Sequence, residues 1–139
     1  MRKKRKIPRS RDAMVNMLFD MLVYFLKSEV FSISWVKNLR DIGRRHYSLD
    51  GMNRKRGIKY EIFLHERLQT NPFRATRNLV HETFHCFSSI DANDVEERVV
   101  RYLTRYFWQK STLAQKRFIM QFLPAFNHYA RQPRYHETR

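Results

Sequence analysis

The sequence predicts a small α+β domain, made of an N-terminal helix, a three-stranded, mainly antiparallel sheet and three further helices. Apolar residues recur at helical spacing over 12–27 and again beyond residue 71. Between these regions, short segments alternate apolar and polar residues, as strands do. A chain of 139 residues with 42% hydrophobic content can bury one modest core. We expect a basic disordered arm over 1–11, one domain over 12–124 and a basic tail over 125–139.

The chain is strongly basic, with 28 Lys and Arg against 13 Asp and Glu and a net charge of +15. Residues 1–11 hold seven of the basic side chains and no acidic one, and removing them leaves +8 on the rest. The charge is therefore distributed, which makes nucleic acid a candidate partner beside the simpler explanation of solubility. A single cysteine, Cys86, excludes an internal disulfide framework and fits a cytoplasmic location.

The first helix is predicted from Asp12 to Lys27, where six apolar residues follow i, i+3, i+4 spacing. A basic start before an apolar run is also typical of a signal peptide or a membrane span. However, Asp20 interrupts the run, only about 15 residues separate Arg11 from Lys27, and no small-residue cleavage site follows. We therefore expect a packed helix and no membrane insertion.

Three strands are predicted next, at Phe31–Val36, Arg45–Leu49 and Ile58–His65. The basic segment Asn53–Gly57 is expected to be a loop between strands. The third strand has the clearest alternation. Its free edge is a candidate for pairing with an extended substrate, although it could equally be an ordinary member of the sheet.

The motif H-E-x-x-H stands at His81, Glu82 and His85, inside a helix predicted to begin at Asn71-Pro72 and to run to about Phe87. On a helix, the two histidines lie one turn apart on the same face and can bind one zinc ion. Glu82 then lies beside the metal, where a carboxylate can take a proton from water. The alternative is that two histidines stand by chance on an ordinary amphipathic helix.

A third protein ligand is needed for a catalytic zinc site. A second helix, capped by Asn93 or Asp94, carries Glu96 within an apolar stripe that includes Val99, Val100, Leu103 and Phe107. A buried carboxylate is usually compensated by a cation, so Glu96 is the expected third ligand. Glu97 is expected to point the other way, toward Arg101 and Arg105.

Other assignments of this region stay open. Glu97 could complete a capping box with Asp94, and both glutamates could be first-turn acids favoured by the helix dipole. Asp91 is a further candidate ligand, because it occupies the last position of an H-E-x-x-H-x-x-G-x-x-H pattern in which Ser88 replaces glycine. Glycine is the better residue for the sharp turn which that pattern needs.

The last predicted helix is capped by Ser111-Thr112 and ends at Pro124. Its apolar face consists of Leu113, Phe118, Ile119, Phe122 and Leu123. The tail beyond it contains His128 and His136, which are either distal ligands or, more simply, solvated side chains.

The order and spacing of these motifs resemble a known group of enzymes. H-E-x-x-H followed by Glu96 on the next helix, and preceded by the strand at 58–64 and a proline-initiated helix, is similar to the small gluzincin metallopeptidases. It also resembles the minimal H-E-x-x-H domains of SprT-like and ImmA/IrrE-like proteins. The resemblance implies a zincin-like domain with an antiparallel sheet whose edge strand lies along the cleft. It also implies zinc held by His81, His85 and Glu96, with Glu82 as general base.

The sequence thus predicts a zinc metallopeptidase that hydrolyses peptide bonds in a peptide or protein substrate. The oxyanion donor would be a tyrosine or a histidine near the zinc; Tyr47, Tyr60, Tyr102 and Tyr106 are available, and His128 or His136 is a more distant alternative. The competing hypothesis is a basic module that binds nucleic acid or protein, in which the H-E-x-x-H helix is not catalytic.

Overall fold

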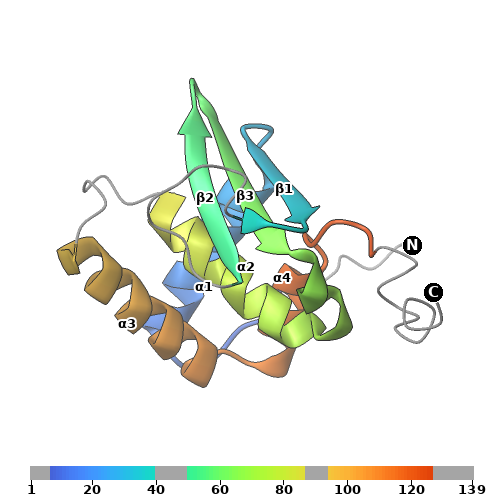
Figure 1. Cartoon of the computed structure of the whole chain (residues 1–139). Helices are drawn as coiled ribbons and strands as arrows, with labels where there is room; N and C mark the ends of the chain where they lie inside the picture. The colour runs from blue at the N-terminus through green and yellow to red at the C-terminus, as the bar shows by residue number, and fades with distance from the viewer. Residues whose placement is uncertain (1–6, 40–49, 87–93, 127–139) are drawn as a thin grey trace.

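The computed structural model describes residues 7–39, 50–86 and 94–126 (Figure 1). These residues form an α+β fold, which confirms the predicted class. The elements in chain order are α1 (Ala13–Lys27), β1 (Phe31–Val36), β2 (Gly51–Arg56), β3 (Lys59–His65), the 3-10 helix η2 (Glu66–Thr70), α2 (Pro72–Cys86), α3 (Asp94–Lys110) and α4 (Leu113–Met120).

Helix α2 is the centre of the fold (Figure 1). It packs against β2 and β3 on one side, and it also contacts α1, α3 and α4. The largest fully buried side chains come from all of these layers and include Phe19, Leu22, Met52, Ile62, Leu64, Leu79, Phe84, Phe107 and Ile119. Because α2 is enclosed on several sides, its polar residues between β2 and α3 lie next to the core rather than in bulk solvent.

The three-stranded sheet is mixed, with the strand order β1-β3-β2. β2 pairs with β3 antiparallel, but β1 pairs with β3 parallel, from Phe31 opposite Tyr60 to Val36 opposite His65. The prediction of a mainly antiparallel sheet is therefore wrong for one of its two pairings. Alternation of apolar and polar residues shows that a segment is a strand, but it carries no information about strand direction.

β3 is the central strand, so of the two interpretations of this strand, the free edge for a substrate is wrong and the ordinary member of the sheet is confirmed. Both of its edges are occupied, one by β1 and the other by β2. The candidate strand Arg45–Leu49 lies outside the described residues. In the part of the sheet that the structure describes, β2 is the edge strand nearest to α2.

β2 replaces most of the loop predicted at 53–57. Its basic residues are stabilised by partners directly opposite on β3: Arg54 Nε lies 2.7 Å from Glu61 Oε1, and Lys55 Nζ lies 5.4 Å from the centre of the Tyr60 ring. Such cross-strand pairs stabilise an edge strand whose sequence looks like a loop. The hairpin turns at Gly57, whose φ of 61° is readily adopted by glycine.

The predicted helix starts at Asp12 and Thr112 are confirmed. The Asp12 carboxylate accepts a hydrogen bond from the Val15 backbone at 3.1 Å, and Thr112 forms a capping box with Gln115. At the end of the predicted arm, Arg9 pairs with Asp20 at 2.9 Å, while residues 1–6 and 127–139 lie outside the described residues. Within the described part of the chain, none of the helices combines the length and the apolar character needed to cross a membrane.

Candidate metal centre

Two histidines of α2 form the first half of the site. The helix starts where predicted, because the Asn71 side chain accepts a hydrogen bond from the Arg74 backbone at 3.2 Å and Pro72 occupies the first turn. His81 and His85 therefore lie one turn apart, with ring centroids separated by 4.9 Å. Their side chains are only 18% and 12% exposed, so the pair is largely withdrawn from water.

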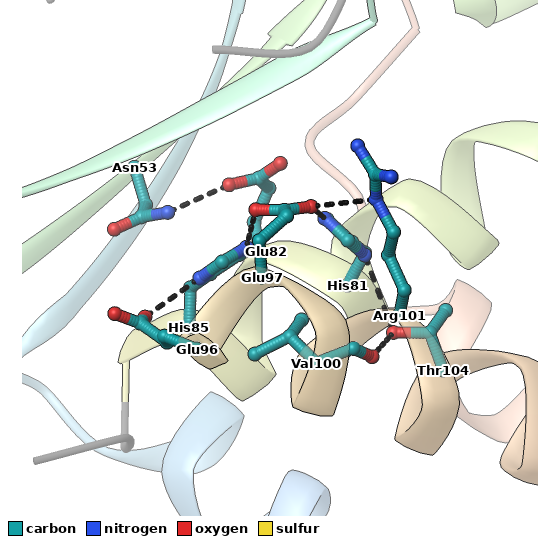
Figure 2. Close-up of polar contacts among 9 residues, drawn as sticks. All are labelled: Asn53, His81, Glu82, His85, Glu96, Glu97, Val100, Arg101 and Thr104. Carbon is teal, nitrogen blue, oxygen red and sulfur yellow. Dashed lines mark hydrogen bonds and ion pairs between the residues drawn. The ribbon is translucent and has the colours of Figure 1, made fainter. Parts of the chain in front are cut away.

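Helix α3 supplies the second half, through Glu97 (Figure 2). One carboxylate oxygen of Glu97 lies 3.0 Å from Nε2 of His85, and the other lies 3.4 Å from Nε2 of His81. The potential ligand atoms of these three residues all lie within 4.8 Å of one another. Two imidazoles and a carboxylate are a typical protein ligand set for catalytic zinc.

Glu96, the predicted third ligand, occupies a different place. It is 4% exposed, as its position in the apolar stripe predicts, and its carboxylate lies 2.8 Å from Nδ1 of His85. Glu96 and Glu97 thus lie on opposite sides of the same imidazole ring (Figure 2). This arrangement favours Glu97 as the metal ligand and Glu96 as the residue that orients His85. Asp91, the other candidate, lies outside the described residues.

The expectation that Glu97 points away from the histidines is wrong. Its carboxylate does pair with Arg101, at 3.0 Å, but the same group also contacts both imidazoles. Successive helical positions diverge by about 100°, which is narrow enough for both side chains to reach one ring placed between them. Helical periodicity alone could not show this, because the position of that ring depends on how α2 packs against α3.

Hydrogen bonds to both Nδ1 atoms orient the rings. Nδ1 of His85 lies 2.8 Å from the Glu96 carboxylate, which can accept a hydrogen bond from this nitrogen. Nδ1 of His81 lies 3.3 Å from the hydroxyl of Thr104, whose own proton goes to the Val100 carbonyl at 2.8 Å. Both imidazoles consequently direct Nε2 toward Glu97, and partners of this kind at Nδ1 are usual around metal-binding histidines.

The electrostatics of this cluster suit a cation. Burial lowers the pKa of His81 to about 4, with a further contribution from His85, so His81 is neutral at pH 7. The Nε2 atoms of both rings and the Glu97 carboxylate converge on one point, an arrangement that a divalent cation would stabilise. In the described part of the chain, the cluster has three members, which leaves room for water as a fourth ligand. A structural zinc site would normally use four protein ligands.

Glu82 lies on the side of the cluster that faces the sheet. It is 3% exposed, and Nδ2 of Asn53, on β2, donates a hydrogen bond to its carboxylate at 2.7 Å (Figure 2). Burial raises the pKa of Glu82 to about 7, although the Asn53 hydrogen bond acts in the opposite direction. A carboxylate with a pKa near neutrality is well suited to accept and then release a proton.

A cavity of about 660 Å³ opens beside this cluster, between α2 and α3. Its described lining residues include His81 and Glu97 but no tyrosine. Of the tyrosines considered as oxyanion donors, Tyr60 stacks on Phe31 and Tyr106 donates a hydrogen bond to Asp12. Tyr102 is 54% exposed and Tyr47 lies outside the described residues, so the geometry selects no oxyanion donor among the four.

Sequence reasoning missed two supporting residues, Asn53 and Thr104. Asn53 was placed in a loop, whereas the strand conformation of β2 directs its side chain toward α2. Thr104 could have been found, because it follows Glu97 at i+7 and Arg101 at i+3 on one polar stripe of α3. Comparisons with protein families, with curated proteins and with solved structures found no match to this chain.

Proposed function

We propose that the protein is a zinc-dependent metallopeptidase, with zinc bound by His81, His85 and Glu97 and with Glu82 as general base. The observation that carries this proposal is the convergence of the three ligand side chains within 4.8 Å, next to a buried glutamate. Nitrogen and carboxylate donors in a group of three favour zinc over magnesium or calcium, which prefer oxygen ligands alone.

Each residue of the site has a separate role in the proposed reaction. Bound zinc would supply a Lewis acid that acidifies water and polarises a peptide carbonyl. Glu82 accepts the proton of the attacking water and delivers it to the leaving amine, so that its carboxylate is regenerated in each cycle. Asn53 holds the Glu82 carboxylate in place, at 2.7 Å, while Glu96 and Thr104 fix the two imidazoles.

β2 is the strand best placed to align a substrate. It is an edge strand within the described sheet, and its residue Asn53 contacts Glu82 directly. An extended peptide that paired with β2 would pass close to the general base. β2 would thus pair with the substrate in place of the third predicted strand. We further propose that the protein acts in the cytoplasm, where the buried thiol of Cys86 would remain reduced.

The test combines metal analysis with hydrolysis of a mixed peptide library, followed by mass spectrometry. We expect about one zinc per chain and cleavage of some library members. Glu82→Gln should retain zinc and reduce turnover by roughly 10²- to 10⁴-fold, since a general base usually contributes that much. Glu29→Gln, which changes the same functional group on the surface, should behave like the parent protein. Parent-like turnover by Glu82→Gln, or purified protein without zinc, would refute the proposal.

A second function has one specific observation in its favour. Lys55, Arg56 and Lys59 are exposed around the turn of the β2–β3 hairpin, where they could contact a nucleic acid. This alternative predicts nucleic-acid binding that weakens steeply with salt and does not depend on zinc. Titration of a labelled duplex at several salt concentrations, with and without chelator, separates the two functions.

A further inference from the structure

The cavity next to the candidate metal centre is unusually rich in arginine. It lies between α2 and α3 and measures about 660 Å³, which is within the range of pockets that bind small ligands or a few side chains. Four arginines, two other polar residues and two members of the metal cluster line it: Arg77, Asn78, His81, Glu97, Arg98, Arg101, Thr104 and Arg105. Half of the lining residues are therefore permanently charged cations.

Helical spacing explains why these arginines gather there. His81 lies near Thr104 and His85 near Glu96, so α2 and α3 run antiparallel along the cluster. On α3, the arginines at 98, 101 and 105 follow i, i+3 and i+7 and form one stripe on the cavity side. On α2, Arg77 precedes His81 by one turn. Arginine side chains thus line the cavity on both its α2 wall and its α3 wall.

Among the residues that the structure describes, these positive charges are not balanced by acidic partners. Glu97 is the one acidic residue among the described residues of the lining, and it is already shared by Arg101 and the two histidines. No acidic side chain that the structure describes forms an ion pair with Arg77, Arg98 or Arg105. Arg101 and Arg105 are also i, i+4 neighbours of like charge, a spacing that weakens a helix. A metal cation at the cluster would increase the imbalance further.

We propose that this cavity is a specificity pocket for the acidic side chains of a peptide substrate, next to the bond that is cleaved. The proposal rests on the metallopeptidase function above, and it names the substrate class as peptides rich in Asp and Glu. Arginine pairs with carboxylates through two parallel hydrogen bonds, and Arg77, Arg98 and Arg105 are available for such pairing. Asn78 adds a neutral hydrogen-bonding group to the same wall.

The same observations disfavour a nucleic acid in this cavity. Proteins that bind single strands combine a basic groove with aromatic side chains on which bases stack. The cavity has the arginines, but its described lining residues include no Phe, Tyr or Trp. Its opening beside His81 and Glu97 also suits a side chain that neighbours a bond held at the metal centre. Carboxylates of a peptide therefore satisfy the charge without requiring a stacking surface.

The test measures binding separately from catalysis. Zinc-loaded Glu82→Gln protein is titrated with two fluorescein-labelled peptide pools, which alternate random residues with either fixed Glu or fixed Gln, and fluorescence anisotropy is recorded. Each partly exposed arginine–carboxylate pair contributes roughly two- to fivefold in affinity. With two such pairs, we expect the Glu pool to bind about tenfold more tightly at low salt, and the preference to shrink at high salt.

Matched variants then test whether the preference for the Glu pool comes from the arginines of the cavity. The double change Arg98→Gln and Arg105→Gln, made in the Glu82→Gln protein, should abolish it. Arg11→Gln with Arg117→Gln removes the same charge from exposed positions outside the cavity and should preserve it. Arg105→Glu should favour a third pool with fixed Lys. Arg101 is left unchanged because it contacts Glu97.

Two results would overturn the proposal. The first is equal binding of the Glu and Gln pools, or a preference that survives the Arg98 and Arg105 changes. The second is tighter binding of an oligothymidine than of the Glu pool, lost in the same double variant, which would assign the cavity to nucleic acid. Zinc content and library hydrolysis of the parent protein are measured separately. Loss of the acidic preference with zinc and hydrolysis intact would refute this pocket alone, whereas missing zinc and hydrolysis would refute the proposed function.

Discussion

Exchange of Glu96 and Glu97 for glutamine, one at a time, would separate the proposed metal ligand from the residue that we propose orients it. Glu97 approaches Nε2 of both histidines, at 3.0 and 3.4 Å, so Glu97→Gln removes the charge of the proposed ligand. Glu96 approaches Nδ1 of His85 at 2.8 Å, and in Glu96→Gln the amide oxygen can still accept that proton. We expect both variants to weaken zinc binding, and Glu97→Gln to weaken it more.

The magnitudes follow from the two roles. Structural zinc sites with four ligands bind with about 10–16 kcal/mol, or about 2.5–4 kcal/mol per ligand, so loss of the Glu97 ligand should reduce zinc affinity roughly 10²- to 10³-fold. Removal of a residue that supports a ligand typically costs 10- to 100-fold in metal affinity, and Glu96→Ala should fall in that range. Because Glu96→Gln keeps a hydrogen-bond acceptor for His85, its loss of zinc affinity should be about 10-fold or less.

Competition with a chromophoric zinc chelator at pH 7 measures these affinities directly. Circular dichroism and thermal unfolding of the metal-free variants check that the fold is retained, and Glu29→Gln serves as the surface control. The reasoning would be refuted if Glu96→Gln lost zinc as severely as His85→Ala while Glu97→Gln bound it like the parent. In that case the original assignment of Glu96 as ligand would be right, and the positions of the two carboxylates would have to be exchanged.

Two further changes test the surroundings of the site. Asn53→Ala removes the hydrogen bond that lowers the pKa of Glu82, so the acid limb of the pH–rate profile should move to higher pH. The expected shift is about one pH unit, because a hydrogen bond to a charged group contributes about 1.5 kcal/mol. An acid limb that stays in place would mean that a group other than Glu82 sets it. Asp50 pairs with Arg67 at 2.7 Å and Arg74 at 2.6 Å. Burial raises the pKa of Asp50, but the two arginines outweigh it and the net pKa is lowered from 3.8. This stabilisation is present above pH 3.8 and is lost as the pH falls through the folded pKa. Asp50→Asn should therefore reduce the free energy of unfolding by about 1 kcal/mol at pH 7, a small value because the arginines are half exposed, and the deficit should shrink in urea titrations toward pH 3. A deficit that is constant with pH would show that the charge of Asp50 is not its cause.

Local sequence signals accounted for the helices. Asp12 and Thr112 begin their helices by capping, and Asn71-Pro72 does the same for α2. These capping interactions join residues three positions apart, so a short stretch of sequence is enough to predict where each helix begins. For the same reason, the placement of His81 and His85 on one helical face could be predicted.

The strands were less accessible to prediction. β2 contains three consecutive basic residues and lacks the alternation typical of a strand, and it is stabilised by partners on β3 such as Glu61 and Tyr60. The parallel pairing of β1 with β3 depends on where the chain re-enters the sheet. Both features arise from contacts between strands, which no single segment encodes.

The order of the amino acids was enough to predict the α+β class, the helix that carries both histidines, and the two candidate carboxylates that follow it. The packing of the elements was needed to show which carboxylate meets which ring nitrogen, that Asn53 contacts Glu82, and that four arginines line the cavity beside the cluster. The physical reason is that the first set of features depends on interactions local in the sequence, whereas the second depends on contacts between distant elements. Helical periodicity fixes the angular position of a side chain around its own axis, whereas the partner it reaches is set by the packing of a second element against that axis.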